Sequence, residues 1–112
     1  MLFRSLLRED GYAVVTVARA DEAIRTVRNE PFDLILLDLR MPDTDGMGVL
    51  EELRSCGEAT PILMITGFGS IDVAVRALHH GADDFLTKPL DPDVLSSRVA
   101  ELIDRQIGRA HV

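Results

Sequence analysis

Three polar residues each follow a short, mostly apolar stretch of the chain, and their chemistry suits the handling of an anion. They are Asp38, Thr66 and Lys88. Short apolar stretches of this kind predict strands that are buried on both faces of a parallel sheet. The carboxyl ends of such strands open into the crevice where α/β sheets bind ligands. The sequence therefore predicts that a carboxylate, a hydroxyl and an ammonium group meet at one edge of a sheet.

Helix and strand patterns alternate along the rest of the chain. We expect helices up to about residue 9 and at 21–30, 47–56, 70–80 and 91–106, and strands at 12–17, 34–38, 62–66 and 85–87. Ser70 is predicted to cap the fourth helix, and Gly11 and Gly81 are predicted to end helices. The alternation predicts a three-layer α/β/α fold built on a parallel sheet.

Composition narrows the class of protein. A length of 112 residues fits one domain, and a formal net charge of −7 argues against nucleic-acid binding by this domain. Cys56 is the single cysteine, so an internal disulfide is excluded and a reducing cytoplasm is the expected location. The longest apolar stretches are far too short to span a membrane, so no membrane contact is expected.

Three motifs in this order resemble the receiver domain of bacterial two-component response regulators over nearly the whole chain. They are Asp38 followed by Pro42 and Gly46, the stretch 64–67 (Met-Ile-Thr-Gly), and the stretch 81–89 (Gly-Ala-Asp-Asp-Phe-Leu-Thr-Lys-Pro). The stretch 66–75 resembles receivers of the nitrogen-regulator (NtrC) class, although FixJ-like receivers and those of hybrid kinases stay open. The resemblance implies a flavodoxin-like (CheY-like) sheet of strand order 2-1-3-4-5.

The resemblance also implies a role for each site residue. Asp38 would accept a phosphoryl group from a sensor histidine kinase, and Thr66 and Lys88 would contact the phosphoryl oxygens. Mg²⁺ would be held by Asp38 and by the backbone carbonyl of Arg40. A domain of this kind is a phosphoacceptor and not an enzyme in the usual sense.

Further expectations concern the loops and the switch. Gly67 would let a backbone amide approach the phosphate, and the peptide before Pro89 would be cis. Thr66 and Phe85 would move together on phosphorylation. The surface formed by the fourth helix, the last strand and the last helix would then bind an output domain or a second copy of the chain. The implied function is phosphorelay signal transduction, and the expected output is control of transcription.

The chain departs from the family at its beginning. Receivers start with a buried central strand that ends in an acidic pair, which supplies other Mg²⁺ contacts, and no such segment precedes the first expected helix. We therefore expect the first, central strand and the acidic pair to be missing and the Mg²⁺ site to be incomplete. Residues 1–5 and 107–112 match translations of a DNA-sequencing adapter in opposite orientations. On that interpretation the receiver sequence is 6–106.

Two other classes of function share this fold. In an aspartate-based phosphatase Asp38 would turn over phosphate, but that family has a second aspartate two residues later, where this chain has Arg40. A phosphorylation-independent interaction module would use the fold only as a scaffold. The set of Asp38, Thr66 and Lys88 favours the receiver over both.

Overall fold

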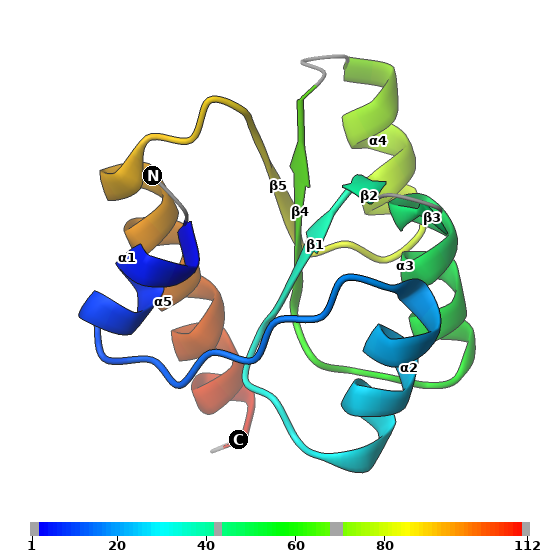
Figure 1. Ribbon diagram of the computed structural model, residues 1–112, viewed down its shortest axis with the longest axis horizontal. Coiled ribbons are helices and arrows are strands. Elements are labelled where there is room, and N and C mark those ends of the chain that lie inside the picture. The colour runs from blue at the N-terminus through cyan, green and yellow to red at the C-terminus, as the bar shows by residue number, and fades with distance from the viewer. Residues whose placement is uncertain (1–2, 42–43, 68–70, 111–112) are drawn as a thin grey trace.

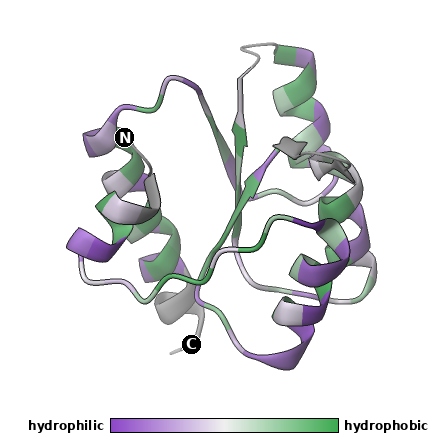
Figure 2. Cartoon of the chain, in the orientation of Figure 1, coloured by the Kyte–Doolittle hydropathy of each residue, from purple (hydrophilic) through white to green (hydrophobic). Residues whose placement is uncertain are grey.

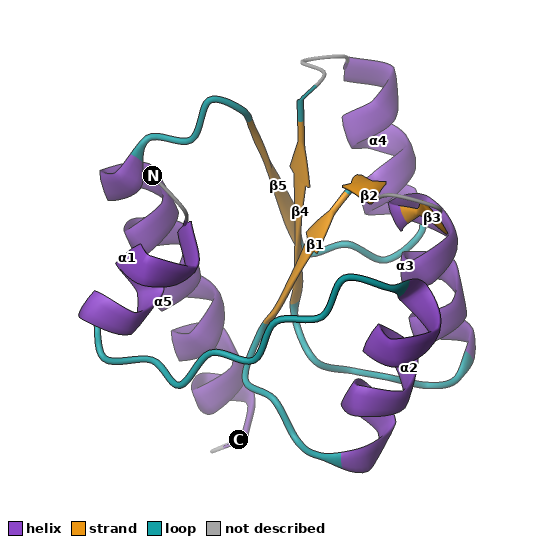
Figure 3. Cartoon of the chain, in the orientation of Figure 1, coloured by secondary structure: helices purple, strands orange, loops and turns teal. Residues whose placement is uncertain are grey.

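The computed structural model describes residues 3–41, 44–67 and 71–110, which form one layer of strands between two layers of helices (Figures 1 and 3). Helices are α1 (Phe3–Glu9), α2 (Ala20–Asn29), α3 (Gly46–Ser55), α4 (Ile71–His79) and α5 (Pro92–Ala110). Strands are β1 (Ile35–Asp38), β2 (Arg40–Met41), β3 (Thr44–Asp45), β4 (Ile62–Thr66) and β5 (Asp84–Thr87). In the described residues, no helix is long and apolar enough to cross a membrane.

The central sheet is parallel and has the order β1-β4-β5. All residues of β4 are buried, as expected for a strand that is paired on both sides and covered on both faces. Helices α1 and α5 pack together on one face, and α2, α3 and α4 lie on the other (Figure 1). This arrangement confirms the predicted three-layer α/β fold.

Apolar side chains fill the two spaces between the sheet and the helix layers. Figure 2 shows hydrophobic colour on the strands and hydrophilic colour on much of the outer helix surfaces. One core cluster joins β1 and β4 to α2 and α3, and includes Leu37, Leu50 and Leu53. The other joins β4 to α1 and α5, and includes Leu63 and Leu95. Burial on both faces explains why the strand sequences are apolar without alternation.

The predicted strand at Tyr12–Val17 is wrong, because the structure has this segment in no ladder. Its β-branched composition favours a strand, but a strand also needs a neighbour for its backbone groups. The described residues contain no strand on the free side of β1, so the segment runs as extended chain. The two-stranded antiparallel sheet of β2 and β3 was not predicted.

The other predicted elements are confirmed to within a few residues at their ends. Gly11 and Gly81 follow helices with positive φ, the backbone conformation for which glycine was predicted there. Ser70, the predicted cap of α4, and Pro42 of the first motif lie outside the described residues.

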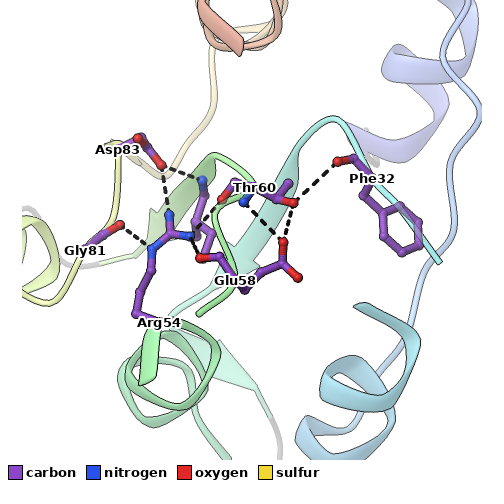
Figure 4. A network of polar contacts seen from close by, with 7 residues as sticks. Phe32, Arg54, Glu58, Thr60, Gly81 and Asp83 are labelled. Carbon is purple, nitrogen blue, oxygen red and sulfur yellow. Dashed lines mark hydrogen bonds and ion pairs between the residues drawn. The ribbon is translucent and has the colours of Figure 1, made fainter. Parts of the chain in front are cut away.

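Arg54, near the end of α3, holds together the loops at the amino ends of β4 and β5 (Figure 4). Its guanidinium donates to the carbonyls of Glu58 at 2.6 Å, Thr60 at 2.9 Å and Gly81 at 2.9 Å. It also pairs with Asp83 Oδ2 at 3.0 Å, and the same oxygen accepts the amide of Ile62 at 2.9 Å. A planar group with several fixed donors is suited to this task.

Replacing the fully buried Leu50 by alanine is expected to lower the free energy of unfolding by about 2–5 kcal/mol, since the cavity would remain largely unfilled. Leu78→Ala on the exposed side of α4 is the matched control and should change the free energy by less than about 0.5 kcal/mol. Urea denaturation of both variants measures the difference. Equal losses would show that α3 is not packed as described.

Thr60→Val is expected to raise the pKa of Glu58 toward its ordinary value. The Thr60 hydroxyl donates to Glu58 Oε2 at 2.6 Å, and this bond is the main cause that lowers the pKa. A lowered folded-state pKa stabilises the fold at pH values above the unfolded pKa, and the effect is lost as the pH falls through the folded value. The stability gap between wild type and variant should therefore be largest above about pH 5 and shrink below about pH 4. Denaturation at several pH values, with an NMR titration of Glu58, tests this, and a gap that widens in acid would contradict it.

Candidate functional site

The parallel ladder brings the three predicted site residues to one edge of the sheet. Asp38 ends β1, Thr66 ends β4, and Lys88 follows β5 directly. Asp38 is in register with Ile65, and the amide of Lys88 donates to the carbonyl of Thr66 at 2.8 Å. The positions of Asp38 and Thr66 thus follow from strand pairing, while Lys88 lies directly after β5 and is tied to β4 by its amide.

Lys88 and Asp38 form an ion pair at this edge. Lys88 Nζ lies 2.7 Å from Asp38 Oδ2, and the two side chains are 42% and 26% exposed. A pair with this much solvent contact contributes little to stability. Its importance is chemical, because it places a cation beside a carboxylate oxygen at a position that ligands can reach.

Thr66 sits at the inner side of the site and borders a small cavity. The residue is 2% exposed, while Phe85 on the neighbouring strand is partly buried. Thr66 and Phe85 both line a cavity of about 10 Å³ whose other walls are apolar. Those walls are Leu39, Met64, Val73, Ala74 and Ala77. The structure therefore brings together the two residues predicted to act as a switch, between the sheet and α4.

The remaining predicted residues lie around the same edge. The Lys88–Pro89 peptide is cis, as the resemblance implied. Gly67 is exposed, and among the described residues a Cβ there would meet nothing within 4 Å. Arg40 lies in β2, where its backbone pairs with Asp45.

Gly46 has a role that the sequence reasoning did not assign. A Cβ on Gly46 would lie 2.6 Å from the Asp38 carbonyl oxygen and 2.7 Å from Leu39 Cα. Its amide donates to the carbonyl of Leu39 at 3.2 Å. The first turn of α3 therefore packs directly on the backbone that carries Asp38. The signal was present, since Gly46 belongs to the motif that begins at Asp38.

The metal site predicted at this edge has few protein ligands. Among the described residues, no group of three or more histidine, cysteine, aspartate or glutamate side chains could hold an ion. Asp38 and the Arg40 carbonyl are the ligands predicted for Mg²⁺, which prefers octahedral oxygen ligands. One carboxylate and one carbonyl do not make a dedicated cage, so their role as ligands stays a prediction.

Comparison with known proteins decides the family. The response regulator receiver domain family matches residues 1–100. The chain belongs to the response regulator receiver family. It is 40% identical over 102 residues to the transcriptional regulatory protein ZraR of Salmonella typhimurium, and 42% identical over 102 residues to the regulatory protein LuxO of Vibrio vulnificus. These alignments cover 91% of the chain but only 23% and 22% of the two relatives.

Solved receiver structures agree with this assignment. A CheY-like receiver domain from Methanospirillum hungatei is 32% identical with a TM-score of 0.87, and covers 95% of this chain and 85% of its own. The receiver domain of NtrX from Brucella abortus is 29% identical with a TM-score of 0.83, and covers 89% and 85%. The similarity to ZraR and LuxO confirms the predicted likeness to receivers of the NtrC class. Receiver domains are phosphoacceptors in two-component systems and generally bind Mg²⁺.

Gly46→Ala is expected to destabilise the domain by about 1–3 kcal/mol, since its methyl group would overlap backbone atoms that cannot easily move. Gly48→Ala is the matched control on the same helix, where a Cβ meets nothing within 4 Å. That substitution should stabilise by roughly 0.5–1 kcal/mol through helix propensity. Urea denaturation tests both signs, and a Gly46→Ala protein as stable as the Gly48→Ala protein would refute the contact.

Proposed function

We propose that Asp38 accepts a phosphoryl group from a phosphohistidine of a sensor kinase. The observation that carries the proposal is the 2.7 Å contact between Lys88 Nζ and Asp38 Oδ2 at the carboxyl edge of the sheet. A carboxylate is a competent nucleophile toward phosphorus, and the adjacent cation can stabilise the charge that develops on the transferred group.

The reaction exchanges one bond for another. A carboxylate oxygen of Asp38 attacks phosphorus, the bond from phosphorus to the histidine nitrogen breaks, and an acyl phosphate forms on Asp38. Lys88 then pairs with a phosphoryl oxygen in place of the carboxylate, and the Thr66 hydroxyl donates a hydrogen bond to another. Catalysis of this kind consists mainly of positioning and charge neutralisation.

The Mg²⁺ ion that receivers use neutralises phosphoryl charge when it is bound. In this chain, Asp38 and the carbonyl of Arg40 would contribute to its coordination, with phosphoryl oxygens and water supplying further ligands.

Phosphorylation would act on the partner surface through Thr66 and Phe85. The new group adds about 1.5–2 negative charges at Asp38, which would draw the Thr66 hydroxyl toward it. The cavity of about 10 Å³ that Thr66 and Phe85 both line has room for only about one water molecule, so a turn of the Phe85 ring would require α4 to move as well. The ring and α4 would then shift together.

The output surface would be that of α4, β5 and α5. On α4, Ile71, Val75 and Leu78 are exposed apolar residues at helical spacing, and Val94 on α5 is exposed as well. An output domain or a second copy could cover them. Since ZraR and LuxO are named as regulators and the first of them as transcriptional, we propose transcription control in the cytoplasm as the output.

Two other functions are less well supported. A phosphatase of this fold would need a general acid two residues after Asp38, and Arg40 cannot supply one at neutral pH. A phosphorylation-independent module would not require the Lys88–Asp38 pair.

Incubation with acetyl phosphate and Mg²⁺ should add the mass of one phosphoryl group to the chain, and Asp38→Asn should abolish the addition. Asp33→Asn, an exposed aspartate two residues before the start of the same strand, is the matched control and should keep it. Intact-mass spectrometry reads out both variants. Continuous release of phosphate would favour the phosphatase, while an unmodified wild-type chain would favour the module.

A further inference from the structure

The C-terminal end of α4 is fixed to α3 and to the sheet by the bonds of Arg54. The carbonyl of Gly81, two residues beyond the helix, accepts the Arg54 guanidinium at 2.9 Å. The guanidinium also pairs with Asp83 Oδ2 at 3.0 Å, and that oxygen accepts the amide of Ile62 in β4 at 2.9 Å. The two charged side chains are only 21% and 23% exposed, so solvent weakens their interaction less than that of a surface pair.

Two further contacts hold the same end of the helix. His80 Nε2 lies 3.3 Å from Glu51 Oε1 on α3. The amide of Ala82 donates to the carbonyl of Ala77 at 3.0 Å, and both alanines are buried in the core cluster that contains α3. The chain that leaves α4 is therefore held by directed bonds to α3 and β4.

The N-terminal end of α4 is held differently. Within the described part of the chain, the side chains of Ile71, Asp72 and Val73 form no hydrogen bond or ion pair with another element. Ile71 is 79% exposed, and the contacts of Val73 and Ala74 with the sheet are apolar. Apolar contacts have no preferred direction, so this end can change its position more easily than the other.

The switch residues lie beside α4 and contact its apolar face. Thr66 and Phe85 share the small cavity with Val73, Ala74 and Ala77 of the helix. The cavity has room for only about one water molecule, so a turn of the ring must displace the helix that forms its wall. Because the C-terminal end is bonded in place, the displacement falls mainly on the N-terminal half.

We infer that α4 rotates about its C-terminal end when Asp38 is phosphorylated. This inference rests on the function proposed above, and it assigns different behaviour to the exposed apolar residues of the helix. At about 1.5 Å per residue, Ile71 lies about 15 Å from Gly81 along the helix and Leu78 about 4.5 Å, so one rotation moves Ile71 about three times as far. Ile71 and Val75 therefore change position with phosphorylation, and Leu78 stays nearly in place.

Spin-label distances measured on the full chain by pulsed electron paramagnetic resonance test the inference. One label is attached to α5 through Arg105→Cys, and the other to α4 through either Asp72→Cys or His79→Cys, in a Cys56→Ser background. The three labelled positions are exposed. Phosphorylation with acetyl phosphate and Mg²⁺, checked by intact mass, should change the distance from position 72 roughly four times as much as the distance from position 79.

Loss of the anchor provides a second measurement. Asp83→Asn removes the charge that pairs with Arg54, so the distance change from position 79 should rise toward the change from position 72. Arg76→Gln is the matched control on the exposed side of α4, since its side chain forms no hydrogen bond or ion pair with the described residues, and it should keep the fourfold ratio. Urea denaturation checks that both variants are folded.

Each result supports or overturns the inference. A larger change from position 72 that is lost only in Asp83→Asn supports it. Equal changes from both positions, a ratio that Asp83→Asn leaves unaltered, or a phosphorylated chain in which neither distance changes would overturn the rotation and leave the proposed function intact. A chain that gains no phosphoryl group would overturn both, and the intact mass distinguishes that result from the others.

Discussion

Hydrogen bonding of β4 on both sides is the constraint on which the rest of the structure depends. This strand is buried at every residue, so its backbone groups have to be satisfied by β1 and β5. Once those ladders form, the strand ends are fixed relative to one another. Asp38 and Thr66 then lie at the same edge of the sheet, and Lys88 follows directly after β5.

The two ends of the sheet are held by different kinds of interaction. At the amino ends, the guanidinium of Arg54 bonds to three carbonyls and to the carboxylate of Asp83, and the group is only partly exposed. At the carboxyl ends, an ion pair joins Lys88 and Asp38 within reach of solvent. The first arrangement has several donors in one rigid plane and resists displacement. The second is partly exposed to solvent, so a ligand can reach both side chains.

Sequence reasoning predicted that Asp38, Thr66 and Lys88 lie at one edge of the sheet, because the end of an apolar strand can be recognised in a sequence. Apolar stretches followed by Asp38, Thr66 and Lys88 are local signals, and parallel pairing then determines that the three residues meet. The segment 12–17 was wrongly predicted as a strand because its β-branched composition was given more weight than its need for a neighbouring strand, and the structure has it in no ladder. Contacts between distant loops, such as Arg54 with Gly81, were also invisible, because nothing in the neighbouring sequence of an arginine indicates what it will bind.

The hydrogen bonds of Arg54 can form only in a fixed order while the chain is being synthesised. Its partners near Thr60 leave the ribosome soon after it, but Gly81 and Asp83 follow 27 and 29 residues later. Until then part of the guanidinium keeps its hydration, and the loop before β4 lacks the carboxylate that bonds to the amide of Ile62. A nascent chain that stops short of Asp83 consequently exposes the apolar β4 without its anchor. The fully buried strand β4 therefore gains this anchor only late in synthesis. Until then its apolar surface is exposed, and exposed apolar surface of this kind is what chaperones bind.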